Sequence, residues 1–252
     1  MMAALAVVFG GLIGGAFGLL GGGGSILTVP IFVYVLGVDA KPAIAMSLAV
    51  VALTSAIGAV GHWRSGNVNL RVGAVFAGVA TLGTWLGTRL SVYVPGMVQL
   101  SILAVMMAMA AVVMLRGRTP AEPAGRAHVG LATLVGSAAA VGGLTGLVGI
   151  GGGFLIVPAL VALGVSMREA IGSSLAIIAL NALVGFAGLA GRVPVDWRAV
   201  ALVAAGTAPG IACGVRLQPR VSQTHLRRGF AVLLLVVASL MLYQQASRVL
   251  GA

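Results

Sequence analysis

Charged residues divide this chain into long apolar stretches. Eight stretches carry no Asp, Glu, Lys or Arg: Met1–Val38, Pro42–Trp63, Val72–Thr88, Leu90–Leu115, Ala127–Met167, Ala170–Gly191, Ala199–Val215 and Gly229–Ser247. A charged side chain at the centre of a bilayer costs at least about 2.5–3.5 kcal/mol, so charges mark the ends of membrane-spanning helices. The pattern therefore predicts an all-α polytopic membrane protein.

The stretches repeat along the chain. The segment GLLGGGGSILTVP (Gly18–Pro30) matches GLVGIGGGFLIVP (Gly146–Pro158) at an offset of 128 residues, and later matches follow at an offset of 127. They pair Ser47–Ala49 with Ser174–Ala176, Asn69–Arg71 with Asp196–Arg198, and Leu82–Leu90 with Pro209–Leu217. The sequence thus predicts two homologous membrane repeats, residues 1–115 and 128–252, joined by a polar linker over residues 116–127.

The first stretch of each repeat is too long for one membrane helix. The 38 residues of the first copy would extend about 57 Å at 1.5 Å per residue, whereas the hydrocarbon core is about 30 Å thick. Glycine costs about 1 kcal/mol inside a helix, so a run of glycines ends one. Each repeat is therefore predicted to open with a helix broken by glycines, at Gly21–Gly24 in the first copy and at Gly149–Gly153 in the second.

The broken stretches leave the topology open. If each crosses the membrane once, a repeat has four transmembrane segments and the two copies are parallel. If each crosses twice, a repeat has five segments and the copies are inverted. Lys and Arg divide 8 to 7 between the two sides in the first case and 10 to 5 in the second. Because cytoplasmic loops carry the excess of Lys and Arg, this favours inverted repeats with a cytoplasmic linker and both termini outside.

Composition and charge narrow the function classes. Hydrophobic residues make up 60% of the chain and charged residues 8%, with 39 glycines, whereas soluble proteins carry about 25% charged residues. A soluble fold is therefore excluded. The net charge of +11 comes from Lys and Arg between the apolar stretches, so we expect a lipid bilayer and no nucleic acid as partner. The single cysteine, Cys213, is expected to be a small buried side chain.

The glycine breaks form the first candidate site. A helix that begins inside the membrane presents free backbone amides with about half a positive charge, which can bind an anion without a basic side chain. Paired Gly-interrupted segments point to a transporter's binding site; the alternative is close helix crossing, which small residues also serve. The candidate substrate-binding residues are Gly21, Gly22, Gly23, Gly24, Ser25, Gly151, Gly152 and Gly153.

Polar side chains on the following segment add to this candidate site. Ser47 and Thr54 are seven residues apart and share one helix face, as do Ser174 and Asn181 in the second repeat. Such side chains either hydrogen-bond a substrate or join helices at about 0.6 kcal/mol per bond. The sequence alone leaves both roles open, with Asn181 the stronger substrate candidate.

Other motifs favour structural roles. Glycines at a spacing of four predict close helix packing: Gly10, Gly14, Gly18, Gly83, Gly87, Gly210 and Gly214. Arg89 and Arg216 end such helices and are interpreted as interfacial anchors, with attraction of anions as the alternative. His62, His128 and His225 lie near segment ends and are also expected at the interface.

Acidic residues are few and peripheral. The four acids all lie in links or at segment edges: Asp39, Glu122, Glu169 and Asp196. Because none is in the middle of a membrane segment, a proton or metal-cation relay built on buried carboxylates is not expected. The sequence predicts no metal site and no cofactor, and it favours an anionic substrate. It also carries no motif of an intramembrane enzyme, so we expect no catalytic activity.

In combination, these motifs give the chain its resemblance to the sulfite exporter TauE/SafE family, also called the 4-toluene sulfonate uptake permease family. Each glycine segment is followed by a Ser-Leu-Ala core and a Gly-x-x-x-Gly-x-Arg-Leu segment, so the resemblance covers nearly the whole chain. It implies transport of sulfite, sulfonates or related organosulfur anions across a bacterial inner membrane. It directs attention to Gly21–Gly24, Gly151–Gly153, Ser47 and Ser174. Ile150 departs from the pattern, because the first copy has Gly22 there.

The predicted function is secondary transport of a small anion bound between the Gly-broken half-helices, with export as the expected direction. A passive anion channel and a permease for a non-sulfur carboxylate are the alternatives. The sequence has no ATP-binding motif. Active transport would therefore need an ion gradient, with a proton or sodium as coupling ion, or the charge of the substrate itself. A homo-oligomer is left open.

Overall fold

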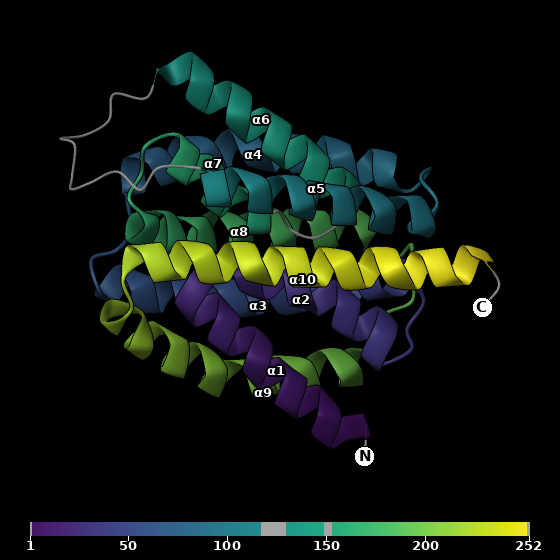
Figure 1. Cartoon of the computed structure of the whole chain (residues 1–252). Coiled ribbons are helices and arrows are strands. Elements are labelled where there is room, and N and C mark those ends of the chain that lie inside the picture. The colour runs from purple at the N-terminus through teal and green to yellow at the C-terminus, as the bar shows by residue number, and fades with distance from the viewer. Residues whose placement is uncertain (1, 117–129, 149–152, 251–252) are drawn as a thin grey trace.

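The computed structural model describes residues 2–116, 130–148 and 153–250, and the regular secondary structure of these residues is helical (Figure 1). Ten α-helices, a π-helical segment (η1) and a short 3-10 helix (η2) make up this part of the chain. In chain order they are α1 (Met2–Leu20), α2 (Gly23–Pro30), η1 (Ile31–Val35), α3 (Ala40–Arg64), α4 (Leu70–Ser91), α5 (Gly96–Arg116), α6 (Leu131–Val148), α7 (Gly153–Ala162), α8 (Met167–Leu189), α9 (Trp197–Leu217), η2 (Gln218–Arg220) and α10 (Gln223–Leu250).

Six helices of the described residues are long and apolar enough to cross a bilayer: α3, α5, α6, α8, α9 with η2, and α10. Two shorter apolar helices cover Ala6–Leu20 and Gly24–Val35. Large apolar side chains such as Leu82 and Leu86 are exposed on the outer surface, where a soluble protein would place polar residues. The prediction of an all-α polytopic membrane protein is confirmed. Of the predicted linker, only Arg116 lies within the described residues.

Polar caps fix the starts of α4 and α9. The Asn69 side chain accepts a hydrogen bond from the amide of Val72 at 3.2 Å, and Asp196 accepts from the amides of Arg198 and Ala199 at 2.9 and 3.1 Å. Such caps satisfy first-turn amides that have no partner within the helix. The positions that the sequence aligned, Asn69 and Asp196, therefore have the same structural role.

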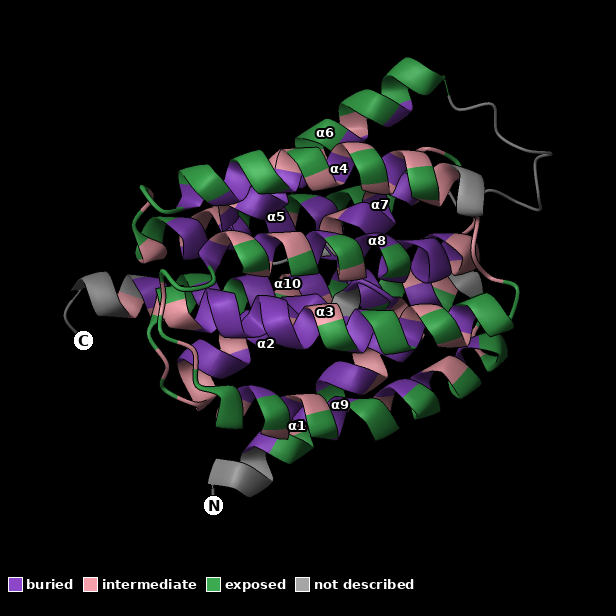
Figure 2. Cartoon of the chain, turned by 180° about the vertical axis from the view of Figure 1, so that it is seen from behind, coloured by how far each residue is buried: buried purple, intermediate pink, exposed green. Residues whose placement is uncertain are grey.

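The helices pack around a central pair, α3 and α8 (Figure 1). α4 packs on α8, α9 packs on α3, and α5 lies against α10. Two crossed pairs flank this core, α1 with α9 and α4 with α6. Figure 2 shows much of α3 buried, while α4, α6 and α9 carry exposed outer faces. In the central pair and in both flanking pairs, one helix comes from the first half of the chain and the other from the second half.

Close backbone approach explains the glycines of the two flanking pairs. A Cβ added to Gly18 would lie 2.6 Å from the carbonyl oxygen of Ile211, and one added to Gly83 would lie 2.8 Å from the amide nitrogen of Gly143. Cβ atoms do not approach backbone atoms so closely, and only glycine fits there. The packing role predicted for the glycines at a spacing of four is confirmed for all of them.

The prediction for Cys213 was wrong, because its side chain is exposed. The buried face of α9 carries Gly206, Ile211 and Gly214, and Cys213 falls beside that stripe. A membrane helix is apolar on all faces, so a small apolar residue fits the lipid side as well as the protein side.

Candidate functional site

The first glycine break is a tight turn between α1 and α2. Gly21 has a positive φ of 64°, a conformation that residues with a Cβ rarely adopt. Its amide still donates to the carbonyl of Phe17 at 2.9 Å, and Gly22 then caps the start of α2. α2 packs back against α1, so the chain reverses direction at this turn. The first stretch is therefore two short helices in a hairpin.

The start of α7 lies directly against this turn. A Cβ added to Gly153 would lie 3.0 Å from the Cβ of Ser25 and 3.1 Å from the carbonyl oxygen of Gly22. A Cβ added to Gly21 would lie 3.0 Å from the Ser174 hydroxyl. The structure thus brings Gly21, Gly22, Ser25, Gly153 and Ser174 together. Gly151 and Gly152, the other predicted residues of the second break, lie outside the described residues.

The hydroxyl groups of the three candidate serines are held by their own helices. Ser25 donates to the carbonyl of Gly22 at 2.7 Å. Ser47 donates to the carbonyl of Ile44 and Ser174 to that of Ile171, both at 2.8 Å. Each hydroxyl oxygen keeps lone pairs that can accept another hydrogen bond. The three side chains are fully buried, so any ligand they met would be sealed from solvent.

The amides at the start of α2 make long hydrogen bonds. The amide of Gly24 donates to the carbonyl of Gly21 at 3.4 Å, and that of Ser25 donates to Gly22 at 3.2 Å. These lengths lie beyond the usual 2.9–3.0 Å, so the bonds are weak. Gly24 is further covered by the ring of Phe17, which a Cβ at this position would overlap. α2 itself begins at Gly23.

Thr54 and Asn181, the second polar pair, differ in how they are satisfied. Thr54 donates to the carbonyl of Val50 at 2.8 Å within its own helix. The side-chain oxygen of Asn181 accepts from the hydroxyl of Thr81 at 2.8 Å and so joins α8 to α4, while its Nδ2 has no hydrogen-bond partner among the described residues. Asn181 lies two helical turns, about 10 Å, from Ser174.

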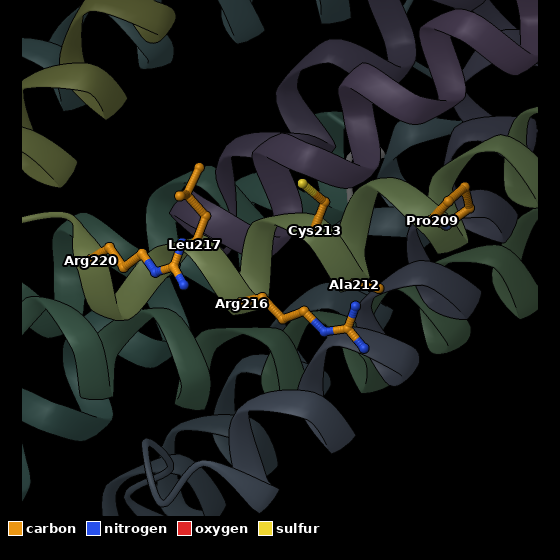
Figure 3. Close-up of a pocket in the computed structure, with 6 residues that line it drawn as sticks. All are labelled: Pro209, Ala212, Cys213, Arg216, Leu217 and Arg220. Atoms are coloured by element: carbon orange, nitrogen blue, oxygen red, sulfur yellow. The ribbon is translucent and has the colours of Figure 1, made fainter.

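Two pockets are lined by residues other than these. The larger, about 490 Å³, is a groove along α9 and η2 (Figure 3), lined by Pro209, Ala212, Cys213, Arg216, Leu217 and Arg220. The smaller, about 90 Å³, lies between the start of α3, the end of α4, the start of α5 and the end of α8. It is lined by Lys41, Ile44, Ser91, Val92, Gln99, Leu189, Arg192 and Val193. Neither pocket has a carboxylate in its lining.

The two helix-terminal arginines are exposed, and Arg89 lies over the ring of Trp85, with its guanidinium carbon 4.0 Å from the ring centre. This fits an anchor at the membrane interface. Arg216 is exposed as well and lines the larger pocket.

Sequence reasoning misplaced His62. The side chain was expected at the interface, but it is fully buried, and its Nε2 lies 3.1 Å from the carbonyl oxygen of Gly18. α3 continues to Arg64, so His62 falls inside the last turn on the face that meets α1. Buried amides were missed too: Gln99 donates to the carbonyl oxygens of Ser91 and Leu147 at 3.2 and 2.9 Å. His225 is exposed as expected, whereas His128 lies outside the described residues.

Comparison with known proteins finds similarity along nearly all of the chain. Residues 3–241 match the family model described as "Sulfite exporter TauE/SafE". A "Probable membrane transporter protein" of Xylella fastidiosa (strain 9a5c) is 38% identical over 237 residues, which cover 91% of this chain and 90% of that protein. "Probable membrane transporter protein YdhB" of Bacillus subtilis (strain 168) is 27% identical over 220 residues, covering 83% and 89%. No solved structure matches the chain significantly.

Proposed function

The chain belongs to the sulfite exporter TauE/SafE family, and from this premise we propose that it is a secondary transporter of a small organosulfur or sulfur-oxygen anion, such as sulfite or a sulfonate. Members of a transporter family carry solutes across the bilayer, and this chain is accordingly a membrane transporter and not an enzyme. Its relatives are bacterial, which supports the bacterial inner membrane as its location.

The observation that carries the proposal is the meeting of the two breaks. Gly153 at the start of α7 lies against Gly22 and Ser25 at the start of α2, and Ser174 lies against Gly21. Two helix starts that face each other place positive dipole ends on one point. The weak amide bonds of Gly24 and Ser25 can be exchanged for stronger charge-assisted bonds to an anion. The substrate site that we propose comprises these residues together with the other sequence candidates, Gly23, Gly24, Ser47, Thr54, Asn181, Gly151 and Gly152, of which the last two lie outside the described residues.

Charge supports an anion as substrate. The three acids within the described residues, Asp39, Glu169 and Asp196, lie at the starts of α3, α8 and α9 rather than in the helix centres. A cation at the breaks would therefore meet positive helix ends and no carboxylate, whereas an anion would meet favourable dipoles throughout.

The architecture that we propose around this site is a pair of inverted five-segment repeats, residues 1–115 and 128–252, joined by the linker 116–127. Reciprocal packing supports it: α1 meets α9 as α6 meets α4, and α3 meets α9 as α8 meets α4. Hydrogen bonds correspond too, since Lys41 donates to the carbonyl of Val92 and Arg168, 127 positions later, donates to that of Pro219. The excess of Lys and Arg on the linker side supports a cytoplasmic linker.

Uptake by purified protein in liposomes tests the function. The panel contains sulfite, thiosulfate, methanesulfonate, sulfate and small carboxylates, under imposed pH and voltage gradients. We expect saturable transport of at least one sulfur anion, and weaker transport after Gly153→Val, because a branched side chain would overlap Ser25. Unsaturable flux would identify a channel, carboxylate transport alone would identify a carboxylate permease, and transport of cations without any anion would overturn the proposal.

A further inference from the structure

His62 is buried, and only one of its two ring nitrogens has a hydrogen-bond partner among the described residues. Its Nε2 lies 3.1 Å from the carbonyl oxygen of Gly18 on α1. A carbonyl oxygen only accepts hydrogen bonds, so Nε2 must carry the hydrogen. In the neutral ring, Nδ1 is then an acceptor with a free lone pair, and it has no hydrogen-bond partner among the described residues. The side chain is 0% exposed, so this lone pair is held inside the protein.

Other unpartnered polar atoms gather at the same end of the bundle, which we call the His62 end. The His62 Cβ lies beside Gly172 of α8, where an added Cβ would be 3.3 Å away, and Arg168 is one helical turn before Gly172. Arg168 donates to the carbonyl of Pro219, the residue after Gln218. Gln218 is fully buried, and neither atom of its amide has a partner in the described part of the chain.

Such a cluster needs partners from outside the protein. A buried polar atom without a hydrogen bond costs about 1–3 kcal/mol, and the His62 end holds bare atoms on His62, Gln218 and Arg168. Pro219 and Arg220, which follow Gln218, are exposed. A water molecule that enters beside them would supply hydrogen-bond partners to the buried Gln218 amide.

We infer that Nδ1 of His62 is the proton-binding site that couples anion transport to a proton gradient, an inference that rests on the proposed function. A proton from water at the His62 end binds the Nδ1 lone pair and makes an imidazolium. The positive imidazolium and the negative anion attract each other, so binding of the proton strengthens binding of the anion and both are carried together. When the anion leaves, Nδ1 returns the proton to water on the other side. Sodium fits less well, because it needs several oxygen ligands, and of the unpartnered atoms on His62, Gln218 and Arg168 only Oε1 of Gln218 is an oxygen.

The charged neighbours explain why an anion is required. The described α1 has no charged residue. The charged groups near His62 on its own helix and on the elements that pack there are Arg64 on α3, Arg168 and Glu169 on α8, Arg216 on α9 and Arg220 on η2. None of these groups hydrogen-bonds to the Nδ1 atom of His62, and a buried charge without a partner is costly, so the imidazolium is favoured only when a negative charge enters with it.

The test separates proton coupling from transport itself. Labelled methanesulfonate, whose charge does not change near neutral pH, is followed in liposomes for His62→Gln and for the control His225→Gln, which alters an exposed histidine. Exchange of labelled for unlabelled anion across the membrane reports transport alone. Net uptake under an imposed pH difference reports coupling, and one proton per anion gives about tenfold accumulation per pH unit.

We expect wild type and His225→Gln to exchange and to accumulate methanesulfonate when the outside is acidic. His62→Gln, whose amide can still donate to Gly18, should exchange but lose accumulation. A second measurement follows proton uptake in weak buffer when methanesulfonate is added to detergent-solubilised protein, expected in wild type and absent in His62→Gln. Accumulation or proton uptake that persists in His62→Gln, or wild-type exchange without accumulation, overturns the inference. If wild type fails even to exchange any anion of the panel, the proposed function fails with it.

Discussion

Each end of the bundle has a basic side chain that donates to a backbone carbonyl, but the residues around these two hydrogen bonds differ. At the Lys41 end, where α3 begins and α8 ends, Lys41 donates to the carbonyl of Val92 at 3.0 Å. At the His62 end, Arg168 donates to that of Pro219 at 3.1 Å. The Lys41 end encloses a cavity of about 90 Å³ with buried Leu189 in its wall. At the position 127 residues earlier, the His62 end has the imidazole of His62.

The α3–α4 loop shows a second difference. It docks tightly on α8, because the amide of Asn69 donates to the Ser173 hydroxyl at 2.8 Å and the carbonyl of Asn67 lies against Gly172. The corresponding positions of α3 hold Ala45 and Met46, which offer neither a hydroxyl group nor the space of a glycine. The same framework therefore carries one end with a buried imidazole and a loop docked on α8, and another end with a small cavity lined by Lys41 and Arg192.

The largest expected effect comes from filling the space at Gly172. In Gly172→Val, the new Cβ would overlap the carbonyl oxygen of Asn67, and the backbone there has little room to move. We expect a loss of about 3 kcal/mol or more, the upper part of the range for overpacking. Ala45→Gly at the other end should cost about 1 kcal/mol, the helix penalty of glycine. Thermal unfolding in detergent measures both, and equal losses would show that the loop contact does not distinguish the ends.

A smaller effect separates the two buried glutamines. Gln99→Leu removes a donor to the carbonyl oxygens of Ser91 and Leu147. Ser91 keeps the hydrogen bond from the amide of Val94 at 3.2 Å, so we expect a loss of about 1 kcal/mol, the lower end of the cost of a lost buried partner. Gln218→Leu removes an amide that no described residue satisfies, so stability should change less or rise. Thermal unfolding in detergent compares the stability of the two variants. A larger loss of stability in Gln218→Leu than in Gln99→Leu would contradict this prediction.

The smallest effect concerns the cavity at the Lys41 end. Arg192→Gln and Lys41→Gln remove the two cationic side chains of its lining. Exposed charges contribute up to about 1 kcal/mol, so KM for an anion presented from that side should rise roughly twofold to fivefold, and less at high salt. Arg198→Gln is the matched control, an exposed cation at the same end outside the cavity. An equal rise in KM for the control would show that the cavity has no special role.

Features set by chain length and by small residues could be predicted from the sequence. The break at Gly21 follows from a stretch too long for one span, and the glycines at a spacing of four identified the contact faces of α1 and α9. The errors at Cys213 and His62 share one physical cause. Helices apolar on every face carry no periodicity that separates the lipid side from the protein side, so burial could not be assigned.

Within the candidate site, the sequence selected residues but not their partners. Ser174 and Asn181 were chosen for their spacing, yet Ser174 lies at the first break and Asn181 bonds Thr81 on α4. Hydrogen bonds between positions a hundred residues apart depend on how the helices cross. The position of Gly153 against Ser25 likewise follows from the packing of α2 on α7, which no local pattern encodes.

The crossed flanking pairs also have a consequence for biosynthesis. The glycine face of α1 fits α9, the last helix but one of the described chain. At about 5–20 residues per second, α9 leaves the ribosome on the order of ten to thirty-five seconds after α1. During that interval the nascent α1 stays in the membrane with its contact groove empty. Assembly is therefore ordered from the middle of the sequence outward, since α4 can pair with α6 before α1 can pair with α9. A chain released after α5 would lack the partners of both α1 and α4.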